Sequence, residues 1–114
     1  MMDKLKYSTN WNNKLNCKIH TTFRMHNPKR FYPGKQFIEE LNGKPVNRVK
    51  VLAVYPRQLD QVTNLEAYHD TGYSLPQFKK IVTTMYKNKA HVPSQLFDLV
   101  LLEVQDSQQT LMQQ

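Results

Sequence analysis

The sequence predicts a single α+β domain, built as a small β-barrel or strongly curved sheet flanked by two helices. Strand-like runs fill the first half of the chain, two helical segments follow, and a long apolar run closes it. When strands are few, a curved sheet with helices packed at its openings is the simplest way to cover every apolar face. The 114 residues are the usual size of one domain.

The first two strands are predicted on either side of a loop. Lys18–Met25 (KIHTTFRM) is rich in β-branched and aromatic residues, which favour a strand. Asn27–Lys35 (NPKRFYPGK) contains two prolines and a glycine, so a loop is expected there. This loop leads into a second predicted strand at Gln36–Leu41.

A hairpin and a buried last strand are predicted to complete the sheet. Asn42 and Gly43 form a strong hairpin signal, and the returning run Asn47–Tyr55 (NRVKVLAVY) becomes continuously apolar toward its end. Leu96–Val104 (LFDLVLLEV) is typical of a strand buried on both faces. The Gln-rich tail that follows is expected to fray.

A short helix is predicted after the hairpin. Val62, Leu65 and Tyr68 have helical spacing, and Gly72 can supply the left-handed residue that often ends a helix.

The second helix has a clearer beginning. Ser74, with Gln77 three residues later, predicts a capping box, and Pro76 is tolerated in the first turn. One apolar stripe runs along the helix and is interpreted as core rather than as binding surface. Its members are Leu75, Phe78, Ile81, Val82 and Met85.

The composition favours a cytoplasmic protein. Cys17 is the only cysteine, so an internal disulfide is excluded. The apolar run Leu99–Leu102 is far shorter than the roughly 20 residues of a membrane span, and the polar start Met1–Asn13 has no signal-peptide core.

Positive charge is concentrated in the first half of the chain. Residues 1–57 hold twelve lysines and arginines against three acidic residues, whereas the rest holds four basic and six acidic residues. Phosphate backbones favour such clustering, and aromatic residues among the cations could stack on bases. RNA is the expected partner, although a basic face that only aids solubility is the alternative. The expected contacts are Arg24, Lys29, Arg30, Tyr32 and Lys35.

The first predicted strand also carries residues with possible catalytic chemistry. Alternation places Lys18, His20, Thr22 and Arg24 on one face, and Ile19, Thr21 and Phe23 on the other. A Thr hydroxyl becomes a nucleophile when a base removes its proton, and a Lys with a lowered pKa can be that base. A carboxylate from the helical half, Asp70 or Glu66, could complete a hydrolytic triad. The alternative is a strand whose charged residues are merely solvated.

Several segments resemble the ASCH domain, a branch of the PUA-like superfamily. They are Lys18–Arg24 (KIHTTFR), Gly34 before a strand, Asp70–Ser74 (DTGYS) and Leu96–Val104. The family signature, roughly GxKxxTxR, opens a small β-barrel flanked by two helices, beside a cleft proposed to bind RNA. The resemblance implies one domain over residues 1–114, with a core at about 15–105 and a short N-terminal extension.

The same resemblance implies an enzymatic alternative. Some bacterial ASCH proteins are amidohydrolases that deacetylate N4-acetylcytidine with a Lys, a Thr and a carboxylate, and at least one relative is described as a ribonuclease. Carried over, Lys18 would be the base and Thr21 or Thr22 the nucleophile. Thr21 keeps the family spacing to Lys18 and Thr22 keeps the spacing to Arg24, because this chain has one extra residue between them.

Two further positions of the motif differ from the family. Asn16 stands where the signature has Gly, and Thr71 aligns near the family's acidic position. Asp70, one residue away, is the expected carboxylate.

Other site classes find no support in the sequence. Cys17, His20, His26 and His69 have no zinc-ligand spacing, so no metal is expected, and no glycine-rich phosphate loop or dinucleotide fingerprint predicts a cofactor. Three hypotheses remain: a module that binds RNA or a modified nucleoside, a hydrolase, and an accessory protein-interaction factor of a phage or mobile element.

Overall fold

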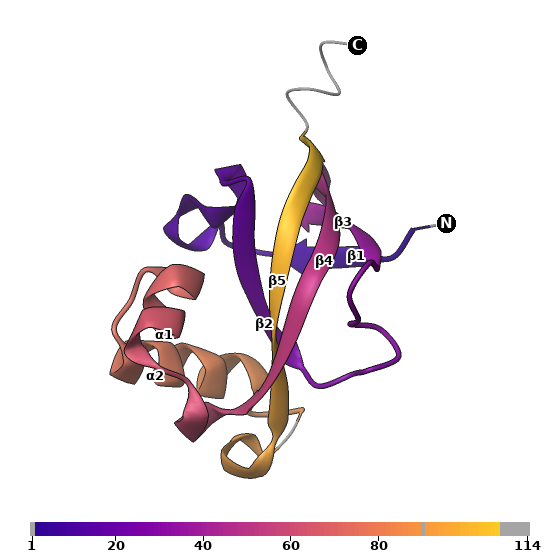
Figure 1. Cartoon of the computed structure of the whole chain (residues 1–114). Coiled ribbons are helices and arrows are strands. Elements are labelled where there is room, and N and C mark those ends of the chain that lie inside the picture. Colours follow the sequence, from indigo (N-terminus) through magenta and orange to yellow (C-terminus); the bar gives the residue numbers. More distant parts are fainter. Residues whose placement is uncertain (1, 90, 108–114) are drawn as a thin grey trace.

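The computed structural model describes residues 2–89 and 91–107, which fold around one five-stranded sheet (Figure 1). Along the sheet the strands lie in the order β1-β3-β4-β5-β2. Only β1 and β3 among these neighbours are parallel, and the other pairs are antiparallel. The strands are β1 (Lys4–Tyr7), β2 (Ile19–Met25), β3 (Gln36–Leu41), β4 (Lys44–Gln58) and β5 (Leu96–Ser107).

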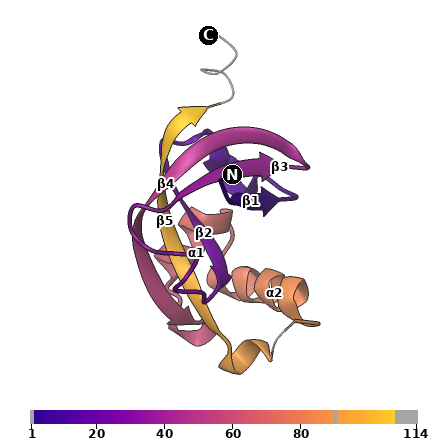
Figure 2. The same cartoon turned by 90° about the vertical axis from the view of Figure 1, so that its right-hand side faces the viewer.

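The sheet is a half-barrel rather than a flat layer. Figure 2 shows β4 arching over the molecule so that the sheet closes toward β1. The pairing register shifts between Arg48 and Val49 and between Val51 and Ala53 against β5, and between Glu39 and Glu40 of β3. Such bulges bend a strand and increase its twist, so they account for the curvature. The predicted curved sheet is confirmed.

The predicted hairpin is present, and β4 begins at Lys44, directly after the Asn42-Gly43 turn. Asn42 and Gly43 both have positive φ, 52° and 82°, as a two-residue type I′ turn requires. β4 continues beyond the predicted Asn47–Tyr55 at both ends, because β3 pairs with it from Lys44 and β5 pairs with it as far as Gln58. Ser107 ends β5, and the rest of the Gln-rich tail lies outside the described residues.

The N-terminal residues are part of the fold, which corrects the expectation of a short extension. β1 pairs with β3, and its Leu5 and Tyr7 are buried in the core. A 3-10 segment, η1 (Trp11–Asn16), then buries Lys14 and Leu15. The strand β1 was not predicted because its alternating pattern covers only four residues, which is too short for a clear periodic signal.

Two helices cover one end of the sheet: α1 (Asn64–Thr71) and α2 (Leu75–Tyr86). The first ends at Gly72 with φ 80°, as predicted. Its buried residues are Ala67, Asp70 and Thr71, whereas Leu65 and Tyr68 are exposed. Helix α1 contacts β2 and η1, and Asp70 forms polar contacts with both of these elements.

The second helix begins at the predicted residue but without the predicted capping box. The Ser74 side chain caps no backbone N–H and instead donates to Gln77. A capping box is found in α1, where Thr63 and Glu66 bond each other's backbone N–H groups. The apolar stripe of α2 is divided: Phe78 and Val82 are buried, Leu75 and Ile81 are half-buried, and Met85 is 54% exposed.

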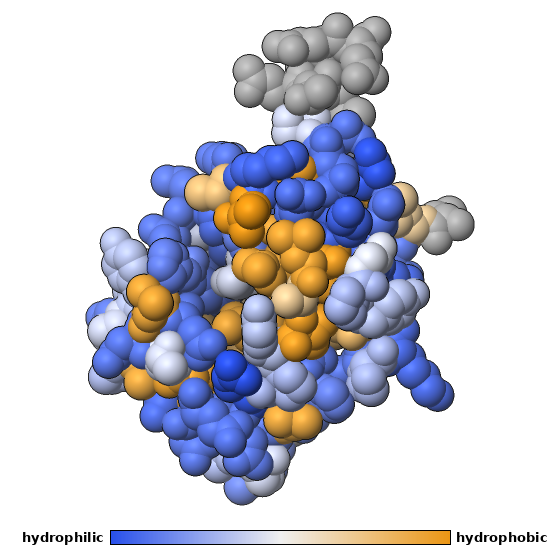
Figure 3. Space-filling model, viewed as in Figure 1, coloured by the Kyte–Doolittle hydropathy of each residue, from blue (hydrophilic) through white to orange (hydrophobic). Residues whose placement is uncertain are grey.

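Apolar side chains fill two clusters. One lies inside the curved sheet and includes Phe37, Val51 and Leu102; the other lies under the helices and includes Phe23, Phe78 and Phe97. Further apolar side chains gather on the outer face of the sheet, over β4 and β5 (Figure 3). No helix in the described part of the chain is long and apolar enough to cross a membrane.

Candidate functional site

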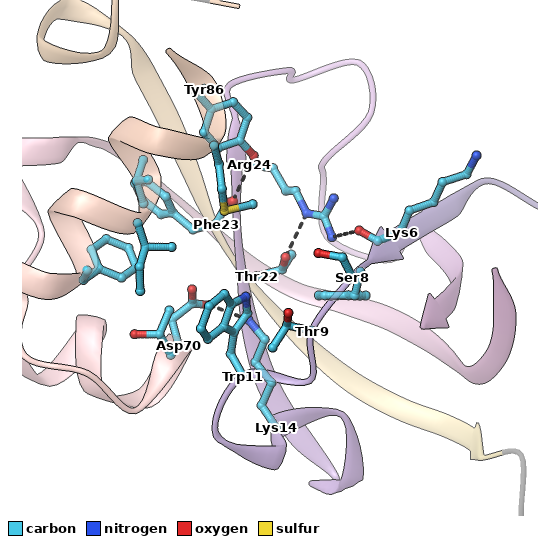
Figure 4. A pocket seen from close by; sticks show the side chains of 16 residues that line it. Lys6, Ser8, Thr9, Trp11, Lys14, Thr22, Phe23, Arg24, Asp70 and Tyr86 are labelled. Carbon is cyan, nitrogen blue, oxygen red and sulfur yellow. Dashed lines mark hydrogen bonds and ion pairs between the residues drawn. The ribbon is translucent and has the colours of Figure 1, made fainter. Parts of the chain in front are cut away.

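The two edge strands of the half-barrel, β1 and β2, approach each other at a seam. The guanidinium Nη2 of Arg24 in β2 donates to the carbonyl oxygen of Lys6 in β1 at 3.0 Å and thereby bridges the seam. Beside it lies a cavity of about 100 Å³, here called the seam cleft (Figure 4). Its polar lining residues are Lys6, Tyr7, Ser8, Thr9, Trp11, Lys14, Thr22, Arg24, Asp70, Thr71 and Tyr86; Phe23, Phe78, Ile81, Val82 and Met85 form the apolar wall.

A buried carboxylate lies at the inner end of the seam cleft. Asp70 accepts hydrogen bonds at Oδ1 from Lys14 Nζ and from Thr21 Oγ1, both at 2.9 Å. The side chains of Lys14 and Asp70 are only 5% and 6% exposed. Two donors therefore converge on one carboxylate oxygen, and η1, β2 and α1 each supply one of the three side chains.

Local backbone geometry brings Lys14 into this position. Asn12 and Asn13 have φ of 57° and 53°, the left-handed region that asparagine tolerates better than most residues. The turn reverses the chain and directs Lys14 inward. At the same place, a Cβ on Gly72 would lie 3.1 Å from the Asn12 side chain, so glycine lets η1 and α1 approach closely.

Arg24 lies between the seam and an aromatic ring. Its guanidinium lies over the Tyr7 ring, 4.7 Å from the centroid, and its Nε donates to the Thr22 hydroxyl at 2.9 Å. Within residues 2–89 and 91–107, neither Arg24 nor Lys6 forms an ion pair with a carboxylate. The mouth of the seam cleft thus carries two cations without a counter-charge.

A second buried carboxylate, Glu39 of β3, lies at the hydroxyl end of Tyr7. It accepts from the Tyr7 hydroxyl at 2.7 Å, from Asn47 Nδ2 at 3.0 Å and from His20 Nε2 at 2.8 Å. The other ring nitrogen of His20, Nδ1, lies 3.0 Å from the Cys17 carbonyl, which can only accept. Donors from three strands therefore surround the Glu39 carboxylate. We call these groups the Glu39 network.

The pKa values in the Glu39 network follow from burial and hydrogen bonding. Burial by itself raises the pKa of Glu39, but the hydrogen bond and charge of His20, with further hydrogen bonds from Tyr7 and Asn47, lower it below the usual value. Burial, aided by the Glu39 charge, raises the pKa of Tyr7 far above its ordinary range. Tyr7 therefore stays a neutral donor.

The structure brings some predicted site residues together and leaves Lys18 apart. Asp70 and Thr21 are in direct contact, and Thr22 lines the seam cleft. Lys18 is exposed, and its Nζ donates to the carbonyl oxygen of Val104 in β5. Lys14, which the sequence analysis did not single out, occupies the position beside Asp70.

The predicted nucleic-acid contacts fall into two places. Arg24 lines the seam cleft, whereas the others belong to the loop before β3. In that loop Lys29 and Tyr32 are exposed, Arg30 donates to the Lys4 carbonyl, and Lys35 pairs with Asp3 at 3.1 Å.

Sequence reasoning missed Lys6, Tyr7 and Lys14 because each belongs to the N-terminal region. A buried lysine is uncommon, so hydropathy gave no reason to place Lys14 inside. The Asn12-Asn13 pair was the available signal, since consecutive asparagines favour a left-handed turn that re-aims the next side chain.

Thr21 also borders a second cavity, on the side of β2 away from the seam cleft. This cavity measures about 340 Å³, and its wall is mostly apolar. The wall includes Ile19, Leu65 and Leu101, with Thr21 and Lys14 at its polar end. Members of the Asp70 cluster thus border two cavities.

Comparisons with known proteins relate the chain to solved structures only. The sequence matches no family model, and no curated protein matches it. The crystal structure of an ASCH domain from Lactobacillus crispatus JV V101 is similar with a TM-score of 0.70 at 14% identity, covering 90% of this chain and 79% of that chain. A protein of Enterococcus faecalis V583 from the family DUF984 is similar with a TM-score of 0.64 at 13% identity, covering 94% and 82%. The chain therefore has the fold of an ASCH domain.

Proposed function

We propose that the protein binds RNA, or a modified nucleoside derived from it, at the seam cleft. The observation that carries this proposal is the pair of cations at its mouth, Lys6 and Arg24, which have no carboxylate partner in the described residues. Arg24 donates to Thr22 and to the Lys6 carbonyl, but no carboxylate of the described residues balances its charge, which suits a phosphate.

The interior of the seam cleft suits a polar group of the ligand. Its volume of about 100 Å³ is several times the roughly 15 Å³ needed for one water in the same measure. Donors and acceptors converge there from Lys14, Thr22 and Asp70, while Phe78 and Val82 close one side. The edge of a base or one of its substituents would find hydrogen-bond partners in such a setting.

The loop before β3 supplies a secondary contact in this proposal. Lys29 and Arg30 line an open depression with Lys4, whose strand leads directly to Lys6. Phosphates that leave the seam cleft along β1 would meet these cations next. Tyr32 and Lys35 lie in the same loop, and the Lys35 charge is partly offset by Asp3.

The test is the salt dependence of RNA binding. Binding of a fluorescent single-stranded RNA of about eight nucleotides is measured by anisotropy over a series of salt concentrations. Each phosphate contact contributes about 0.7 to the slope of log affinity against log salt for single strands. Arg24→Ala is expected to reduce the slope by about that amount. Arg57→Ala, which removes the same charge from β4, is expected to leave it unchanged; equal slopes in all three proteins would contradict the proposal.

A hydrolase is the second candidate, favoured by the contacts of Asp70. Thr21 donates to a carboxylate that also holds Lys14, and a nucleophile hydrogen-bonded to a buried base is a requirement of acyl transfer. N4-acetylcytidine is the substrate to try, because the proposed ligand class includes modified nucleosides.

Matched variants separate the candidate residues of this hydrolase. Release of cytidine is expected to disappear in Lys14→Ala and to persist in Lys18→Ala, since Lys18 bonds the Val104 carbonyl instead. Thr21→Val and Thr22→Val distinguish the two hydroxyls. Absence of cytidine with the parent protein at high concentration would reject the hydrolase and leave RNA binding untouched.

A further inference from the structure

A surface groove lies beside the seam cleft, on the outer side of α2. Trp11, Ile81 and Met85 line both the seam cleft and this groove, so the groove adjoins the seam cleft. The remaining lining residues are Tyr73, Gln77, Lys80 and Thr84. The volume of the groove is about 530 Å³, within the range of about 300–1,000 Å³ that is common for sites of small organic molecules.

Two aromatic rings form one end of the groove. The centroids of Trp11 and Tyr73 lie 5.9 Å apart with their planes at 72°, an edge-to-face contact that holds both rings in place. Tyr73 is 42% exposed and Trp11 is half-buried, so ring surface remains open to a ligand. A preformed aromatic surface of this kind suits a planar partner.

Two residues of the apolar stripe of α2 line the groove instead of being buried in the core. Ile81 and Met85 belong to the stripe expected in the core, yet Met85 is 54% exposed and Ile81 half-buried. Methionine adapts its shape to planar and irregular apolar groups. The surface is therefore apolar and open where a helix in a closed core would be covered.

Positive charge near the groove favours a negatively charged partner. Lys80 lies on its rim, and Lys6 and Arg24 lie at the adjoining cleft. None of the residues that line the groove is acidic. A planar apolar group that carries negative charge nearby would be complementary to both features, as a base next to a phosphate is.

We propose that this groove binds the base that neighbours the one in the seam cleft, stacked against Trp11 and Tyr73. The inference rests on the proposed function and sharpens it: the ligand is single-stranded RNA of at least two nucleotides, not an isolated nucleoside. Bases of a duplex are stacked on each other and are not free to enter.

The single tryptophan of the chain reports on the groove directly. Trp11 fluorescence is followed while the protein is titrated with a single-stranded RNA of about eight nucleotides and, separately, with the same backbone lacking all bases. The RNA is expected to quench Trp11 by stacking. The abasic strand is expected to bind through its phosphates without quenching.

Tyr73→Ala and Tyr55→Ala form a matched pair, because the two tyrosines are 42% and 43% exposed and Tyr55 lies on β4. Loss of one stacked ring is expected to weaken RNA binding by about ten-fold, with binding of the abasic strand unchanged. Tyr55→Ala is expected to bind both strands like the parent. Equal affinity of the abasic strand for parent and Tyr73→Ala also shows that the variant is folded.

The outcomes separate the two proposals. RNA binding that depends on salt and on Arg24, without quenching of Trp11 and without an effect of Tyr73→Ala, would overturn the groove and keep the seam cleft. Failure of both strands to bind would overturn both. A change of Trp11 fluorescence with protein concentration alone would mean that a second copy of the chain covers the groove, and this also overturns the proposal.

Discussion

The half-barrel buries two carboxylates, Glu39 and Asp70, in different surroundings. Glu39 is enclosed: its donors come from β1, β2 and β4, and its exposure is 0%. Asp70 lines the seam cleft, and its partners Lys14 and Thr21 line the second cavity. A carboxylate whose acceptor sites are all occupied inside the protein stabilises the fold, whereas one that borders a cavity is available to a ligand.

The largest difference between the two carboxylates is expected in the free energy of unfolding of Glu39→Gln. Glu39→Gln removes the counter-charge of a buried His20, and loss of one partner of a buried ion pair costs about 3 kcal/mol or more. Urea denaturation measures the free energy of unfolding. Glu40→Gln is the control, because Glu40 pairs with a half-exposed Lys4 and its loss is expected to cost about 1 kcal/mol or less. Equal losses in the two variants would refute the structural role of Glu39.

A smaller loss of stability is expected at Asp70. In Asp70→Asn, the amide oxygen can still accept from Lys14, and both side chains border the seam cleft, so the expected cost is below the roughly 3 kcal/mol of a fully broken buried pair. RNA binding at low salt is expected to strengthen, since a negative charge is removed from the lining of the proposed binding cleft. Exposed Asp60 provides the control variant Asp60→Asn. If Asp70→Asn lost as much stability as Glu39→Gln and its RNA affinity were unchanged, both carboxylates would have a structural role only.

Tyr7 links the two regions, and its hydroxyl tests the link. Tyr7→Phe removes one hydrogen bond to a carboxylate and keeps the ring under Arg24, so a loss of about 1.5 kcal/mol is expected. RNA affinity is expected to stay at the parent value. A large loss of affinity without loss of stability would show that the hydroxyl itself contacts the ligand.

The pH dependence of unfolding gives the smallest expected effect. Because the pKa of Glu39 is lowered in the folded state, its contribution is present above the usual value of 4.5 and is lost as the pH falls through the lowered pKa. Each unit of depression corresponds to about 1.4 kcal/mol. Urea midpoints measured from neutral pH into the acid range should fall less steeply for Glu39→Gln than for the parent. Parallel profiles would mean that Glu39 does not contribute.

The order of strands and helices could be predicted because short stretches of sequence indicate each of these elements. β-Branched and aromatic residues marked β2, the Asn42-Gly43 turn marked the hairpin, and Gly72 marked the end of α1. The edge strand β1 could not be predicted, because its four residues gain their stability from pairing with β3 rather than from their own pattern.

The candidate site could be predicted only in part, for a similar reason. Thr21, Thr22 and Asp70 were identified by residue type and order, and the structure places them around one polar cluster. Lys14 and Tyr7 lie there because of tertiary contacts between segments that are distant in the sequence. The residue pattern of a single strand does not predict such contacts.

The most direct test of the seam cleft is a map of backbone amide shifts during titration with single-stranded RNA. The largest shifts are expected in three segments that line the seam cleft: residues 6–11, residues 22–24 and residues 70–71. Shifts confined to residues 29–35, with the seam unchanged, would contradict this expectation.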